Sequence, residues 1–172
     1  ATDIRYAKAM GRSIKLLATS KKTKDGYAAM VAPYLLSATN PLFSVSDVYN
    51  AIFVHGNVLG DAMFYGSGAG KLPTASAVVA DIVEMAKHLE INIAVEWSSK
   101  KMQLSDYKEL ENQFFVRTSS AKEDIEKAFQ NVSYVELSDA TGEVGFVTET
   151  MKEADYEKAA AALDVIQMIR VA

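Results

Sequence analysis

Short apolar runs and helical patterns alternate through the first half of the chain. Apolar runs bounded by polar or glycine-containing turns predict strands at residues 14–19, 27–35, 51–55 and 62–65. Helices are predicted at residues 2–10, 46–49 and 73–89. In the longest of them the apolar residues recur every three or four positions, as on one face of a helix. The short connections between neighbouring strands indicate antiparallel pairing.

A different pattern begins near residue 112, after a polar connector. Strands are predicted at residues 113–118, 133–138, 143–148 and 165–171, with a turn at 139–142. Ser120–Glu123 and Thr150–Glu153 have the spacing of a capping box, and each predicts the start of a helix. The resulting order, strand–helix–strand–strand–helix–strand, is typical of a ferredoxin-like βαββαβ unit.

Together the two patterns predict an α+β fold. Its first part is a mostly antiparallel sheet with helices on one face, and its second part is the ferredoxin-like βαββαβ unit. We expect a first domain over residues 1–95, a linker over residues 96–111 and a second domain over residues 112–172.

Composition and charge exclude several classes of protein. The 172 residues carry a formal net charge of −4, which gives no reason to expect a nucleic acid or an anionic membrane as partner. No apolar run is long enough to span a bilayer. Cysteine is absent and histidine occurs only as His55 and His88, so thiol catalysis and metal sites built on several such ligands are excluded. A cytoplasmic location fits this composition, and structural roles are expected for both histidines.

The segment Gly66–Thr74, Gly-Ser-Gly-Ala-Gly-Lys-Leu-Pro-Thr, carries the most chemical information. Alternating glycines between a strand and a helix let the backbone approach another group closely. The helix N terminus behind them favours a negatively charged or polar group. The glycine spacing matches neither a P-loop nor a dinucleotide-binding fingerprint. From the residues alone, a ligand site and a tight turn without a ligand are both open.

Several blocks in the first half of the chain resemble, in the same order, successive blocks of homoserine dehydrogenase. These blocks are residues 14–18, 40–42, 50–52, 65–70 and 73–82. The glycine segment with the Pro-Thr-Ala-Ser-Ala-Val stretch behind it is the most specific of them. The resemblance covers roughly residues 1–90.

The resemblance implies an NAD(P)-dependent oxidoreductase that interconverts homoserine and aspartate 4-semialdehyde, on the route to threonine and methionine. It implies that Gly68, Ala69 and Gly70 lie on the cofactor side of the site, with Thr74 as a further cofactor-binding residue. Lys71 is added from its charge alone.

The same resemblance implies what this segment lacks. The family's nucleotide-binding fingerprint and its catalytic lysines lie upstream of such a segment. We therefore expect no catalytic residue, no metal ligand and no bound cofactor in this chain by itself. The chain is expected to be a C-terminal fragment of the enzyme, inactive alone, because hydride transfer needs a cofactor held in register with the reacting carbon. Its preference between NAD and NADP is left open.

Residues 112–172 resemble an ACT domain, an amino-acid-sensing module, in their order of elements and their position after the catalytic part. The loop after the first strand of such a domain carries proline and glycine, whereas here Arg117–Lys122 contains neither. The resemblance implies an amino-acid effector, which this loop disfavours, and side-by-side pairing into a homodimer. The alternatives to an enzyme fragment are therefore a non-catalytic amino-acid-sensing module and a dimerisation module.

Overall fold

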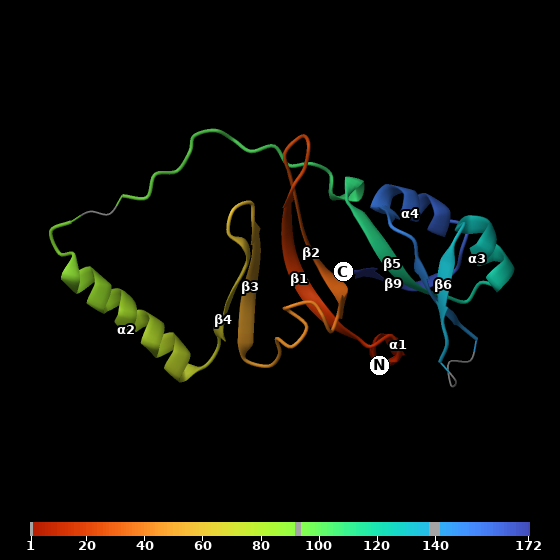
Figure 1. Cartoon of the computed structure of the whole chain (residues 1–172), viewed down its shortest axis with the longest axis horizontal. Helices are drawn as coiled ribbons and strands as arrows, with labels where there is room; N and C mark the ends of the chain where they lie inside the picture. The colour runs from red at the N-terminus through yellow and green to blue at the C-terminus, as the bar shows by residue number, and fades with distance from the viewer. Residues whose placement is uncertain (1, 92–93, 138–141) are drawn as a thin grey trace. The chain divides into compact units, whose positions relative to one another are not determined.

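The computed structural model describes residues 2–91, 94–137 and 142–172 (Figure 1). Its helices are α1 (Thr2–Ala9), α2 (Lys71–Lys87), α3 (Lys122–Ala128) and α4 (Glu153–Ala160), with one short 3-10 turn η1 (Tyr107–Glu109). Its strands are β1 (Arg12–Lys22), β2 (Tyr27–Ser37), β3 (Tyr49–Gly56), β4 (Gly60–Ser67), β5 (Glu111–Thr118), β6 (Val132–Val135), β7 (Val144–Thr148), β8 (Met151–Lys152) and β9 (Val165–Val171).

The chain folds into two compact units, residues 1–43 with 102–172 and residues 44–101. In the first unit the strands form one sheet in the order β1-β2-β9-β5-β7-β6, with β8 paired to β5. In the second unit β3 and β4 form an antiparallel hairpin that is followed by α2. The predicted α+β class and both antiparallel hairpins of the first half are confirmed.

Strand β5 has a different hydrophobic cluster on each of its faces, because successive side chains of a strand point to opposite sides. Phe114 and Val116 face α3 and α4, as part of one buried cluster. Its members are Phe114, Val116, Ile125, Phe129, Phe146, Tyr156 and Leu163. The cluster brings β5, α3, β7 and α4 together around one core, and partly buried residues of β6 and β9 pack against it.

Helix α1 covers the other face of β5. The Tyr6 ring is 1% exposed and lies against Phe115, with the ring centroids 5.3 Å apart. At the start of the helix Asp3 forms an ion pair with Arg117 at 2.5 Å, and Arg117 also pairs with Glu143 at 2.6 Å. The N-terminal helix is therefore packed and ion-paired onto the C-terminal strands.

The pairing of β2 with β9 makes the sheet mixed rather than purely antiparallel. Tyr34 lies opposite Arg170 and Leu35 opposite Val171 in a parallel register. Strands from the two ends of the chain are thus neighbours in one sheet. The expected domains, residues 1–95 and 112–172 with the linker 96–111, remain a prediction, and the compact units divide the chain at different positions.

Two local predictions are wrong. The helix expected at residues 46–49 is a turn, in which Asp47 has a φ of 57° and Tyr49 already pairs with Ser67 in the β3–β4 hairpin. Neither predicted capping box caps its helix, because the N-cap residues are Ala121 and Lys152. The expected turn at 139–142 lies mostly outside the described residues.

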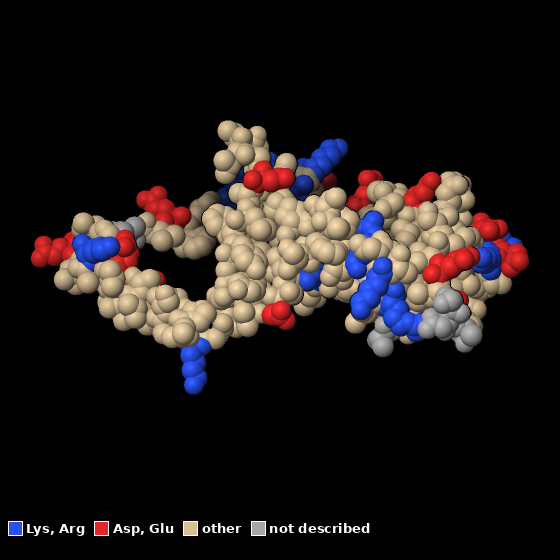
Figure 2. Space-filling view, turned by 60° about the horizontal axis from the view of Figure 1, so that its bottom comes forward, with Lys and Arg blue, Asp and Glu red and all other residues tan. Residues whose placement is uncertain are grey.

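In the second unit, helix α2 has no buried residue. Its apolar side chains Val78, Val79, Ile82 and Val83 are each about half exposed. Figure 2 shows this helix, at the left of the view, as largely uncharged between its ends. Among the described residues, no helix is long and apolar enough to cross a bilayer.

Candidate functional site

The glycine segment forms an exposed turn that joins β4 to α2. The β3–β4 register runs from Gly56 opposite Gly60 to Tyr49 opposite Ser67. One more hydrogen bond follows the hairpin, from Gly68 N–H to Val48 O at 3.2 Å. The turn therefore leaves the hairpin at Gly68 and enters the helix at Lys71.

Gly70 is the last residue of this turn, and its backbone conformation directs the chain into α2. It is the N-cap of α2 with a φ of 115°, a region that side-chain-bearing residues rarely adopt. Its carbonyl accepts the first helical hydrogen bond, from Thr74 N–H at 3.2 Å. A residue with a side chain at this position would strain the entry into the helix.

The start of α2 offers free donors. Gly70 provides no side-chain cap, and Pro73 has no N–H. The N–H groups of Lys71 and Leu72 have no acceptor within the described part of the chain. An exposed helix start with unpaired N–H groups suits a polar or anionic group.

The structure brings the four predicted cofactor-side residues together. Gly68, Ala69, Gly70 and Thr74 lie on this one turn and the first helical turn behind it, and all four are exposed. Their assignment to a cofactor remains a prediction. The turn would fit one wall of a ligand site, since it combines bare backbone with free donors.

The sequence analysis did not identify Asn50 as a candidate site residue. It lies opposite Gly66 on β3, and an added Cβ at Gly68 would overlap its amide nitrogen. The signal that could have found it is the hairpin register, because a polar residue facing two alternate glycines has bare backbone beside it.

The histidines have local partners on the surface of the second unit. His55 Nδ1 lies 2.5 Å from Asp61, the residue opposite it in the hairpin, and His88 Nδ1 lies 3.0 Å from the Glu84 carbonyl oxygen. Among the described residues, no group of three or more His, Asp or Glu side chains could hold a metal ion.

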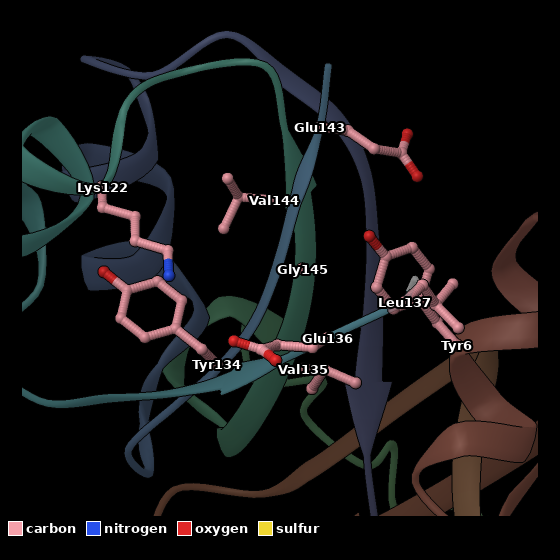
Figure 3. A pocket seen from close by; sticks show the side chains of 9 residues that line it. All are labelled: Tyr6, Lys122, Tyr134, Val135, Glu136, Leu137, Glu143, Val144 and Gly145. Carbon is pink, nitrogen blue, oxygen red and sulfur yellow. The ribbon is translucent and has the colours of Figure 1, made fainter. Parts of the chain in front are cut away.

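A second candidate is a hollow of about 600 Å³ at the end of the β6–β7 pair in the first unit (Figure 3). It is lined by Tyr6, Lys122, Tyr134, Val135, Glu136, Leu137, Glu143, Val144 and Gly145. Lys122 Nζ lies 4.7 Å from the centroid of the Tyr134 ring on one side, and Tyr6 and Glu143 lie on the other. Burial, and then the negative charge of Glu143, raise the pKa of Tyr6. No sequence pattern pointed to this hollow.

In the loop at residues 117–122, where an ACT domain would hold its ligand, backbone N–H groups donate hydrogen bonds within the protein itself. Ser119 N–H donates to Asp164 O at 3.2 Å, and Ser120 N–H donates to Thr118 Oγ1 at 3.1 Å. The Ser120 hydroxyl in turn accepts from Asp164 N–H at 2.8 Å. These bonds leave little free backbone for an amino acid, in line with the missing proline and glycine.

Comparison with known proteins gives a consistent family. The homoserine dehydrogenase family model matches residues 1–83. The homoserine dehydrogenase of Neisseria gonorrhoeae is 45% identical over 92 residues, which are 54% of this chain and 21% of that protein. The homoserine dehydrogenase of Synechocystis is 29% identical over an alignment of 196 positions, which covers 99% of this chain and 45% of that protein.

Solved structures agree with the sequence matches. A homoserine dehydrogenase from Thiobacillus denitrificans has a TM-score of 0.75 at 26% identity, over 99% of this chain and 45% of that one. The S. aureus homoserine dehydrogenase at pH 7.0 has a TM-score of 0.73 at 28% identity, over 99% of this chain and 44% of that one. The chain thus spans less than half the length of these relatives. It belongs to the homoserine dehydrogenase family and represents a C-terminal portion of it.

Proposed function

We propose that this chain supplies one wall of the active site of a homoserine dehydrogenase. That enzyme interconverts homoserine and aspartate 4-semialdehyde with NAD(P), in the biosynthesis of threonine and methionine. We propose that it acts in the cytoplasm. The observation that carries the proposal is the exposed Gly68–Gly70 turn at the start of α2, inside the segment that the family model matches.

The role of the wall is to bind and orient. When bound, the nicotinamide cofactor would supply or accept the hydride. The bare backbone of the turn permits close approach, and the free N–H groups of Lys71 and Leu72 can hold a polar group. The chain by itself brings no nucleotide-binding fingerprint and no catalytic lysine of the family, so we propose that it is inactive alone and holds no cofactor alone.

The test uses the chain and a chimera. In the chimera, the segment of the Neisseria gonorrhoeae enzyme that aligns over 92 residues is replaced by the matching residues of this chain. We expect the chimera to oxidise homoserine with NAD or NADP, and the purified 172-residue chain to show no turnover. A folded chimera without activity would contradict the proposed role of the segment. Turnover by the chain alone would contradict its proposed inactivity.

A second function is supported by the hollow beside β6 and β7. Lys122, Glu136 and Glu143 line it, and Glu143 is paired with Arg117. The hollow therefore offers the Lys122 cation and the Glu136 carboxylate to a zwitterion, with Val135, Leu137 and Val144 as apolar wall. We propose that the ACT-like unit of residues 112–172 binds an amino acid there and forms a homodimer through the free edge of β6.

Calorimetric titration of the 172-residue chain with threonine, methionine and homoserine tests the effector, and light scattering tests the dimer. Lys122→Ala should abolish the heat of binding, whereas Lys127→Ala on the same helix should not. No heat with any of the three amino acids, or a monomer by light scattering, would reject the corresponding half of this proposal.

A further inference from the structure

The backbone of the glycine turn is partly used by the fold itself. Gly68 N–H already donates to Val48 O, and Gly70 C=O already accepts from Thr74 N–H. Gly68 therefore has no N–H to offer a ligand. A polar group beside Gly68 must therefore be bound by the free N–H groups further along the turn or by a neighbouring side chain.

The β3–β4 register provides that side chain. Asn50 lies opposite Gly66, so its side chain shares a face of the hairpin with positions 66 and 68. Both positions are glycine. An added Cβ at Gly66 would meet no atom within 4 Å, whereas at Gly68 it would overlap the Asn50 amide nitrogen. The Asn50 carboxamide thus occupies the place that a side chain at position 68 would take.

The amide is only weakly engaged by the protein. Its one hydrogen bond within the described residues runs from Nδ2 to Val48 O and is long, at 3.5 Å. The residue is exposed, so Oδ1 and one N–H of the amide remain available. One acceptor and one donor side by side are complementary to another carboxamide.

On the face of the hairpin opposite to Asn50, two tyrosine rings hold the strands together. The Tyr49 and Tyr65 rings stack at 5.0 Å between centroids, with an angle of 12° between their planes. This stack holds the start of β3 against the end of β4. The carboxamide is therefore presented from a fixed position beside the turn.

We propose that Asn50 is the residue with which this turn recognises the cofactor. Its carboxamide pairs with the carboxamide of the nicotinamide ring, and position 68 is glycine in order to seat it. The inference rests on the proposed function, because it takes the turn as the cofactor wall.

The recognition half is tested in the chimera described above. Asn50→Ala should raise the KM for the nicotinamide cofactor about tenfold and the Kd from fluorescence quenching equally, the loss expected for one hydrogen-bonding group. The cofactor analogue with a 3-acetylpyridine ring lacks the amide N–H. The unsubstituted chimera should discriminate against this analogue, and Asn50→Ala should lose the discrimination. A merely structural role for Asn50 would not change this ratio.

The matched control is Asn57→Ala, in the turn at the opposite end of the same hairpin, which should leave the KM, the Kd and the discrimination unchanged. Unchanged values in Asn50→Ala would overturn the recognition role. An inactive unsubstituted chimera would instead refute the proposed function, and the seating half would still be decided by the next experiment.

The seating half is tested in the 172-residue chain by amide hydrogen exchange. Gly68→Ala should speed the exchange of the residue 68 N–H about tenfold or more, because the added Cβ displaces Asn50. Combining Gly68→Ala with Asn50→Ala should return the rate to that of Asn50→Ala alone, while Gly66→Ala, which has open space, should have no effect. If the double variant exchanges as fast as Gly68→Ala, the seating role is wrong.

Discussion

At the scale of single residues, glycines of this chain serve different physical needs. Gly70 is required for its backbone conformation, with a φ of 115° at the N-cap of α2. Gly145 is required for space, because an added Cβ would overlap the Tyr6 ring in the core of the first unit. The alternating glycines were visible in the sequence, but the reason for Gly145 was not, since Tyr6 is far from it along the chain.

The substitution Gly145→Ala should therefore destabilise the first unit by about 1–3 kcal/mol, the usual cost of an overpacked core. The Tyr6 ring cannot move aside freely because it is buried against Phe115. Urea unfolding followed by circular dichroism measures the change. Gly66→Ala, where the added methyl group meets open space, is the control and should change the free energy of unfolding by less than about 0.5 kcal/mol. Equal effects of the two substitutions would contradict the packing argument.

The titration of Tyr156 makes the free energy of unfolding depend on pH in the alkaline range. Burial, and then the negative charge of Glu153, raise the pKa of Tyr156 to about 12 from a usual value of 10.0. Above pH 10 the unfolded chain loses this proton while the folded chain keeps it, so the free energy of unfolding falls as pH rises towards 12.

Tyr156→Phe should make that fall smaller by roughly 1–2 kcal/mol between pH 9.5 and pH 11.5, because one titrating group with a raised pKa is removed. Urea unfolding at the two pH values in both proteins measures it. Tyr107→Phe, at a more exposed tyrosine, is the control. A fall of the same size in Tyr156→Phe and in the unsubstituted chain would show that Tyr156 does not titrate in this way.

At the scale of elements, helix α1 packs against the C-terminal strands β5 and β9 as well as against β1 and β2, which follow it in the sequence. Tyr6 and Ala7 pack with Phe115, Ile169 and Val171 on one face of the sheet. The ion pair of Asp3 with Arg117 fixes the start of the helix. Without α1, this apolar face of β5 and β9 would be exposed to solvent.

Tyr6→Ala should consequently destabilise the C-terminal strands by about 3–5 kcal/mol, the range for removing a buried aromatic ring. Ile4→Ala on the same helix is the control, because Ile4 is 54% exposed, and it should cost less than about 1 kcal/mol. Amide exchange of β5 and β9 residues reports the effect locally. Unchanged protection of these strands in Tyr6→Ala would mean that α1 is only loosely attached.

Local patterns predicted most elements, because alternation and helical periodicity depend on neighbouring residues alone. Apolar runs bounded by polar turns located β1 and β2, and Pro73 with the apolar face behind it located α2. The capping box at residues 120–123 failed for a non-local reason: the Ser120 hydroxyl accepts a hydrogen bond from Asp164 N–H rather than from the start of its own helix. The helix expected at residues 46–49 does not form because Tyr49 pairs with Ser67 in the β3–β4 hairpin.

At the scale of the whole molecule, pairings between distant segments could not be predicted. The parallel pairing of β2 with β9 joins residues more than a hundred positions apart, and no local pattern signals it. The candidate turn was found from its glycines alone, whereas Asn50 required the hairpin register and the hollow beside β6 required the packing of α1. The exposed apolar residues of α2 are consistent with a unit that functions within a larger assembly.

Whether the Gly68–Gly70 turn forms a wall of the active site is decided by the catalytic efficiency of the chimera with homoserine and NAD or NADP. We expect a kcat/KM within about tenfold of the parent Neisseria gonorrhoeae enzyme, and a loss of at least about tenfold when Gly70→Ala strains the turn at the start of α2. A folded chimera without turnover, or one in which Gly70→Ala leaves kcat/KM unchanged, would contradict it.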